Sequence, residues 1–133
     1  MSYNNSKEIM LADNAFIVTE TDSTGKILFA NEEFCRVAEY EQEELIGQHH
    51  NLVRHPDMPK DAFKELWDTV KVGKVWNGYV KNITKNGNFY WVFATVYPFT
   101  NESGEQCFLS CRRKPPREKI IEIEKHYQTL SRV

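Results

Sequence analysis

The dipeptide Asn86-Gly87 is the feature that most constrains the fold of this chain. It separates two segments, 76–85 and 88–98, that are rich in aromatic and β-branched residues. A two-residue type I′ turn requires positive φ at both central positions, and Asn followed by Gly is the pair that tolerates this best. The sequence therefore predicts an antiparallel β-hairpin over 76–98.

The length of the loop sets the register of this hairpin. A two-residue loop places Lys85 opposite Asn88 and Asn82 opposite Trp91. Because residues directly opposite each other share a face of the sheet, we expect Asn82 and Trp91 on the inner face and Tyr90 on the outer face. Both faces of the second strand are apolar, so its outer side is expected to be covered, either by residues 1–14 or by another subunit.

The remaining patterns predict further strands and helices. Runs of β-branched and aromatic residues bounded by turn residues predict strands, and apolar positions three or four apart predict helices. Asn31 is suited to cap the first helix. The expected strands are 16–21, 26–30, the two hairpin strands and 106–112, and the expected helices are 32–39, 40–47, 60–70 and 117–130. This order indicates an α+β fold, a five-stranded antiparallel sheet with short helices and one longer helix on one face.

The connection Gln48–Pro59, with the sequence QHHNLVRHPDMP, contains three of the four histidines, an arginine, an aspartate and two prolines. Solvated turns favour Gly, Ser, Asn and Asp instead. The prolines stiffen the backbone and disfavour helical angles at the residues before them. A rigid cationic loop that leads into a helix with Phe63 and Trp67 is a candidate wall for an anionic, ring-containing ligand.

Composition excludes several classes of function. The 133 residues are 41% hydrophobic, and the net charge of −2 gives no electrostatic field for nucleic acid. No apolar run approaches a membrane span of ~20 residues, and the N-terminus has no apolar signal block. We expect a cytoplasmic protein that does not insert into membranes. The three cysteines contain no CxxC pair, so no metal site is predicted.

Several motifs resemble one family. The runs HNLVRHPDMP (50–59), AFKELW (62–67), WNGYVKNITKNG (76–87) and YWV (90–92) are similar to the flavin-binding PAS domains of the aerotaxis receptor (Aer) and CetB-like family. The resemblance extends from about Ala12 to Tyr127. It implies a PAS fold, and it divides the chain into an N-terminal cap segment (1–14), a PAS sensor domain (15–114) and a C-terminal signalling helix (115–133).

The resemblance also implies a cofactor, FAD, bound without a covalent bond. The residues that match the family's motifs at FAD-contacting positions are Asn31, Arg54, His55, Asp57, Phe63, Trp67 and Asn82, with Trp76 and Tyr90 as weaker candidates. One departure is Thr95, which follows Trp91-Val92-Phe93-Ala94 where the family has a different polar residue. The implied function is to report redox or energy state to a chemoreceptor or another signalling partner, with a homodimer formed through the N-terminal segment or the outer sheet face.

Other readings remain open. His49 and His50 could hold haem, because neutral imidazole is its usual ligand, although a haem pocket is apolar and this loop is charged. A PAS module without a ligand could serve only for dimerisation or docking. Enzymes are disfavoured, since the sequence contains no nucleotide-binding glycine loop, GxSxG or HExxH. Aromatic residues at helical spacing, such as Phe63 and Trp67, are also what an ordinary core contains.

Overall fold

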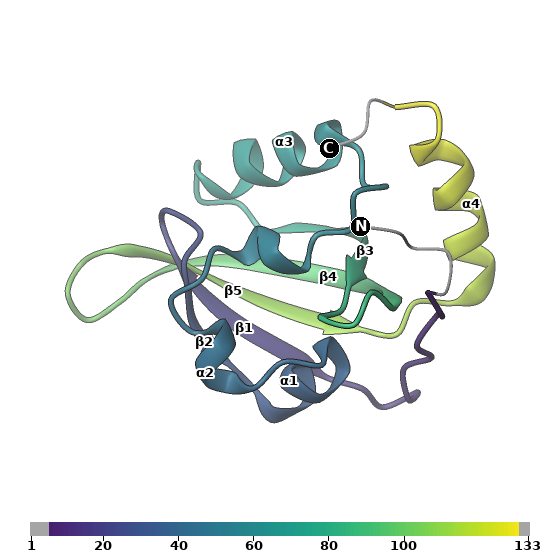
Figure 1. Cartoon of the computed structure of the whole chain (residues 1–133). Coiled ribbons are helices and arrows are strands. Elements are labelled where there is room, and N and C mark those ends of the chain that lie inside the picture. The colour runs from purple at the N-terminus through teal and green to yellow at the C-terminus, as the bar shows by residue number, and fades with distance from the viewer. Residues whose placement is uncertain (1–5, 131–133) are drawn as a thin grey trace.

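A five-stranded antiparallel sheet forms the body of the structure, a computed structural model that describes residues 6–130. The strands lie in the order β2-β1-β5-β4-β3 (Figure 1). Their bounds are β1 Ile17–Asp22, β2 Ile27–Ala30, β3 Trp76–Ile83, β4 Phe89–Thr100 and β5 Gln106–Arg113. The predicted α+β fold class is confirmed.

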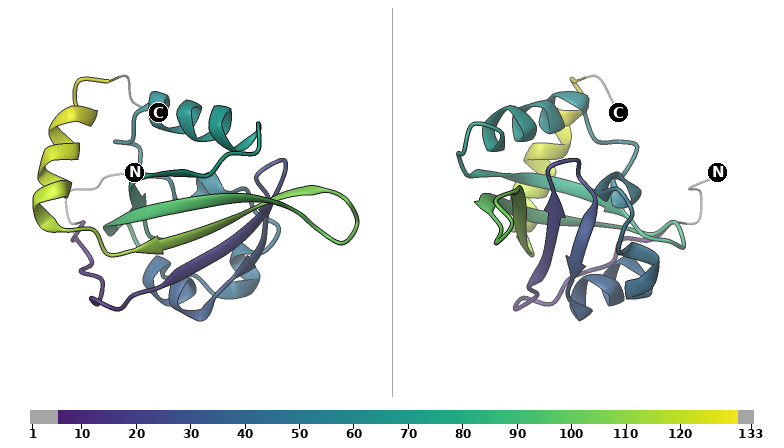
Figure 2. Two further views of the ribbon diagram at one scale, coloured as in Figure 1. Left: turned by 180° about the vertical axis from the view of Figure 1, so that it is seen from behind. Right: turned by 90° about the vertical axis from the view of Figure 1, so that its left-hand side faces the viewer.

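Three helices cover one face of this sheet, and we call that face the inner face. The helices are α1 Glu32–Ala38, α2 Gln42–Leu45 and α3 Lys60–Val70, with the 3₁₀ turn η1 His50–Val53 between the last two. The view from behind leaves the sheet in front of them (Figure 2, left). A fourth helix, α4 Arg117–Tyr127, lies apart from the others. The core fills the space between helices and sheet, with Phe34, Leu45 and Val70 fully buried.

Asn31 caps α1, as its sequence position predicts. Its side-chain oxygen accepts hydrogen bonds from the backbone N–H groups of Phe34 (3.0 Å) and Val18 (3.2 Å). Its amide nitrogen donates to the carbonyl oxygen of Phe16 (2.9 Å). The first helix is thereby fixed to β1, since one side chain satisfies donors on both elements.

The hairpin register differs from the two-residue prediction. Thr84 N–H donates to the Asn88 carbonyl (2.8 Å), and Gly87 N–H donates to the Thr84 carbonyl (3.0 Å), so the loop has three residues. Among residues 6–130, only Glu39 and glycines have positive φ, and in this loop only Gly87 does (87°). This is a type I turn followed by a glycine bulge, not a type I′ turn.

The C-terminal end of α1 accounts for the choice of turn. Lys85 N–H donates to the Ala38 carbonyl (3.1 Å). Hydrogen bonds from Thr84, and then from Asn86 and Asn88, lower the pKa of the Glu39 carboxyl. Asn86-Gly87 alone favours the shorter loop, but these contacts from a distant element stabilise the longer one.

The longer loop moves Trp91 to the opposite face from the one predicted. Asn82 lies opposite Tyr90, and Lys81 lies opposite Trp91. Tyr90 and Asn82 are therefore on the inner face and fully buried, whereas Trp91 faces outward. The prediction that Asn82 and Trp91 share the interior is wrong by one residue of register, which reverses the faces of the β4 side chains relative to β3.

The outer face beside Trp91 is covered by the chain itself. Residues 7–9 are extended, and their backbone pairs with Phe89 of β4. From α4, Tyr127 stacks on Trp91 at 6.3 Å between ring centroids and donates a hydrogen bond to the Tyr79 carbonyl (2.7 Å). Residues 1–5 and 131–133 of the two predicted terminal segments lie outside the described residues. No helix within 6–130 is long and apolar enough to cross a membrane.

Replacing Gly87 tests the observed turn. A Cβ at this position would meet nothing within 4 Å, so only the backbone conformation opposes a side chain. We expect Gly87→Ala to lower the free energy of unfolding by about 1–2 kcal/mol, and Gly87→Asn to cost less because Asn tolerates positive φ. Urea denaturation measures both. Equal losses for the two variants would contradict the turn assignment.

Candidate functional site: an interior cavity with unpaired polar groups

An interior cavity lies between α3, η1 and the inner face of the sheet. Its volume is about 60 Å³. Two aromatic rings form its walls, Trp67 from α3 and Phe108 from β5, whose centroids are 5.4 Å apart in an edge-to-face arrangement. The other lining residues are Thr19, Thr21, His50, Leu66, Val70, Val96, Ser110 and Arg112.

Unpaired polar atoms gather around this cavity. In the described part of the chain, four buried side-chain atoms have no hydrogen-bond partner: Thr19 Oγ1, His50 Nε2, Arg54 Nε and Arg112 Nη1. Thr19, His50 and Arg112 line the cavity. Buried polar groups normally find partners, and leaving one unpaired costs about 1–3 kcal/mol. Such a concentration indicates a site where a polar ligand completes the hydrogen bonds.

The cavity wall is cationic. Burial, and then the charges of His49, Arg54 and Arg112, lower the pKa of His50 to about 3, so its imidazole is neutral. Burial also lowers the pKa of Arg112, but a guanidinium remains charged at neutral pH. Of the residues described, no Asp or Glu lines the cavity. An electron-rich or anionic ligand is therefore favoured there.

Two predicted residues, Asn82 and Tyr90, are polar groups on the inner face that do not line the cavity itself. They face each other across β3 and β4, with Asn82 Nδ2 3.4 Å from Tyr90 Oη. Burial raises the pKa of Tyr90 to about 12, partly offset by the nearby Arg112 charge. A neutral phenol and a side-chain amide can both donate to and accept from a bound heterocycle.

The loop 54–58 runs along the free edge of β3, and its side chains lie on two different sides of that edge. Arg54 pairs with Asn82 as a β-bridge, and its guanidinium lies 3.6 Å from the Phe63 ring centroid, on the α3 side. His55 N–H donates to the Lys81 carbonyl (3.2 Å). Of the predicted loop residues, the structure brings Arg54 towards the cavity.

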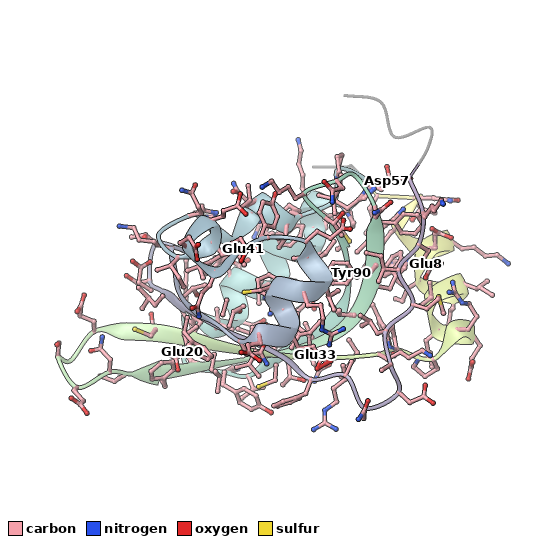
Figure 3. All side chains as sticks on the ribbon, turned by 60° about the horizontal axis from the view of Figure 1, so that its bottom comes forward. Glu8, Glu20, Glu33, Glu41, Asp57 and Tyr90 are labelled. Atoms are coloured by element: carbon pink, nitrogen blue, oxygen red, sulfur yellow. The ribbon has the colours of Figure 1, made fainter. Side chains whose placement is uncertain are left out.

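His55 and Asp57 lie on the other side of this edge. Asp57 Oδ2 is 3.1 Å from the Lys81 ammonium, and His55 Nδ1 accepts a hydrogen bond from Asp57 N–H (3.0 Å). The His55 ring meets Phe89 edge to face at 6.2 Å. Figure 3 shows Asp57 near the rim of the molecule and Tyr90 nearer its middle. Neither His55 nor Asp57 lines the cavity.

Of the other predicted residues, some lie at the cavity and some do not. Trp67 lines the cavity, and Phe63 is half-buried beneath Arg54. The side chain of Asn31 forms its hydrogen bonds with backbone groups, as described above. Trp76 lies on the inner face but donates its indole N–H to Glu65 (3.0 Å).

Sequence reasoning missed Arg112, Thr19 and Ser110, and it considered His50 only as a haem ligand. Arg112 and Ser110 are two apart on β5, so they share one face. They lie opposite Ile17 and Thr19 on β1. The available signal was an arginine that lies opposite a buried residue of the neighbouring strand. This signal can be recognised only when the order of the strands is known.

Acidification tests the buried, neutral state of His50. Because its folded pKa lies below the usual value of 6.5, the unfolded chain binds the proton first. Stability should therefore fall as pH drops from about 6.5 towards 3, by up to about 1.4 kcal/mol per pH unit from this group. We expect His50→Gln to lose less stability than the wild type between pH 7 and pH 5 in urea denaturation, with His126→Gln, an exposed position on α4, as the control. An equal loss in all three proteins would contradict this account.

A family model of the PAS fold matches residues 27–112. The aerotaxis receptor of Escherichia coli is 43% identical over 121 residues, which cover 91% of this chain and 24% of that protein. The nitrogen fixation regulatory protein of Klebsiella oxytoca is 28% identical over 96 residues, 72% of this chain and 19% of that protein. The chain thus spans about a quarter or less of the length of these relatives.

Solved structures share the fold. A light-oxygen-voltage domain studied with a flavin analogue has a TM-score of 0.71 at 15% identity, over 85% of this chain and 87% of that one. A PAS domain from Colwellia psychrerythraea has a TM-score of 0.67 at 23% identity, over 77% and 89%. On the family match and the identity to the aerotaxis receptor, the chain belongs to the PAS fold family.

Proposed function

We propose that this chain binds FAD in the interior cavity and reports redox state to a chemotaxis signalling partner. The observation that carries the proposal is the set of unpaired atoms of Thr19, His50 and Arg112 around a space with aromatic walls. The edge of a flavin ring carries carbonyl oxygens, ring nitrogens and an N–H, which such groups can satisfy. Its faces are aromatic and would lie against rings such as Trp67.

The chemistry of the lining residues suits a flavin ring. The cavity, however, must enlarge to admit the ring. Its 60 Å³ is well below the roughly 300–1,000 Å³ of typical ligand pockets. Leu66 and Trp67 from α3 border the space. A bound ring would therefore displace side chains of α3, and the middle of this helix is held to the start of β3 by the Glu65–Trp76 hydrogen bond.

The similarity to the aerotaxis receptor supports the signalling part of the proposal. Flavin would supply electron transfer, since its ring accepts and releases electrons reversibly. In this role the chain is a cytoplasmic sensor and not an enzyme. Its own residues hold the ring, keep water from it and respond to its charge.

Within this site the residues have different roles. Arg54, Asn82 and Tyr90 would contact the ring or its chain of phosphates, and Phe63 and Trp67 would pack against them. Asn31 and Trp76 would hold α1 and α3 in position. His55 and Asp57 would fix the loop 54–58 against β3, so that their loss affects binding through Arg54.

The same loop offers a route for the signal. Arg54 faces the cavity side of β3, whereas Asp57 binds Lys81, whose side chain lies on the outer face with Trp91. A change of charge in the cavity that moves Arg54 would alter the Asp57–Lys81 pair. Asp57 and Lys81 border the same small outer cavity as Tyr127, so α4 would receive the change.

Haem is the second candidate, and the neutral, unpaired Nε2 of His50 favours it. Imidazole in this state is the common axial ligand. The two guanidiniums nearby argue against a ferric porphyrin centre, because they add positive charge beside the metal. His50→Ala separates the candidates: it would remove the axial ligand and abolish haem binding, whereas a flavin would lose one hydrogen bond and keep the other groups of the site.

Flavin content of purified variants tests the proposed site. We expect Arg54→Ala and Asn82→Ala to lose most bound FAD, because each removes a group on the cavity side of β3. Arg113→Ala, an exposed change on β5, is the control and should keep the wild-type amount. Heat-released cofactor is quantified by chromatography, and circular dichroism confirms folding. Full flavin content in both site variants would refute the assignment.

A homodimer through the outer sheet face is part of the proposal. Phe16, Phe29 and Tyr97 are each more than 40% exposed on the outer side of the sheet. We expect Phe29→Glu with Tyr97→Glu to shift the protein from dimer to monomer in sedimentation velocity, since two charges would face the same apolar surface. A wild-type monomer at all concentrations, or an unchanged dimer in the variant, would exclude this interface.

A further inference from the structure

Arg112 is a half-buried cation without an anionic partner. Its side chain leaves β5 on the inner face, between Ile17 of β1 and Ala94 of β4. Its Nη1 atom is buried and unpaired. Across residues 6–130, no carboxylate forms an ion pair with it. Removing an unpaired charge from water is expensive, so a fold retains one only where something compensates.

The protein groups around Arg112 compensate for little of this cost. The guanidinium lies 5.2 Å from the centroid of the Phe34 ring, a cation–π contact. His50 is neutral at pH 7, as its lowered pKa requires, and Tyr90 is neutral because its pKa is raised. Arg54 adds a second positive charge close enough to affect His50. No negative charge of the described residues lies beside the buried Nη1 atom, so an anionic ligand would be favoured there.

We propose that Arg112 determines which charge state of the ligand the cavity prefers, so that it binds the anionic reduced form of a flavin ring more tightly than the neutral oxidised form. This inference rests on the proposed function and concerns the same cavity. Two electrons from an external reductant and one proton from water convert the neutral ring to a singly charged anion. A second proton would give a neutral product. The guanidinium favours the first product, because opposite charges attract strongly in an interior of low dielectric constant.

Thr19 and Ser110 place the polar edge of such a ligand beside Arg112. Both line the cavity with it, and they lie opposite each other on β1 and β5. The aromatic wall, Trp67 and Phe108, borders the same cavity. A ring packed against these aromatic residues can present its edge to Arg112 Nη1, and neither neighbouring hydroxyl carries a charge that would weaken the attraction.

The test compares the affinity of the apoprotein for oxidised FAD and for FAD reduced with dithionite. We expect Arg112→Gln to weaken binding of the reduced form by about tenfold relative to the oxidised form, which for a two-electron couple lowers the midpoint potential by about 30 mV. Arg113→Gln removes the same charge from the adjacent, exposed position and should change neither value. Circular dichroism verifies that each variant is folded.

A measurement on the wild type covers the case in which Arg112→Gln does not fold. If the reduced ring stays anionic, its midpoint potential should shift by about 30 mV per pH unit between about pH 5.5 and pH 7.5, the value for one proton per two electrons. A slope of about twice that size means a neutral reduced ring and overturns the inference. An unchanged affinity ratio in a folded Arg112→Gln protein overturns it as well. Wild-type protein that takes up no FAD overturns the proposed function and the inference together, so the two failures are distinguishable.

Discussion

The contact between the β3–β4 turn and the C-terminal end of α1 determines what the interior of this protein contains. Glu39 accepts hydrogen bonds from the turn, and the Ala38 carbonyl accepts one from Lys85. These contacts stabilise a three-residue loop, and the loop fixes the register of the two strands. Asn82 and Tyr90 consequently lie on the inner face of the sheet, and Trp91 faces α4. A loop shorter by one residue would exchange the faces of Tyr90 and Trp91.

The edge of β3 carries the second constraint. A sheet edge has unpaired backbone groups, and here the loop 54–58 occupies part of that edge through Arg54 and His55. Arg54 pairs with β3, and the chain then turns at Pro56 and Asp57. Arg54 is on the α3 side of this edge, while Asp57 reaches Lys81 on the outer side. The loop 54–58 thus connects the cationic interior with the outer surface that contacts α4.

The sequence alone was sufficient for elements whose signals are local. The cap at Asn31, the apolar stripe of α3 and the strand-rich order follow from spacing and residue type, and the structure has them. The predicted register was wrong because Asn86-Gly87 indicates only which turn is preferred in isolation. Contacts with Glu39, which is distant in the sequence, stabilise a different turn. Arg112 was missed for a related reason. An arginine on a strand reads as exposed until the order β1-β5-β4 places it between two buried neighbours.

The central claim is that the unpaired groups of Thr19, His50 and Arg112 form a flavin site. The ultraviolet–visible spectrum of the purified protein, recorded before and after dithionite, tests it most directly. We expect the two absorption bands of oxidised flavin, which bleach on reduction and return in air. A single sharp haem band, or a folded and colourless protein that takes up no flavin, would contradict it.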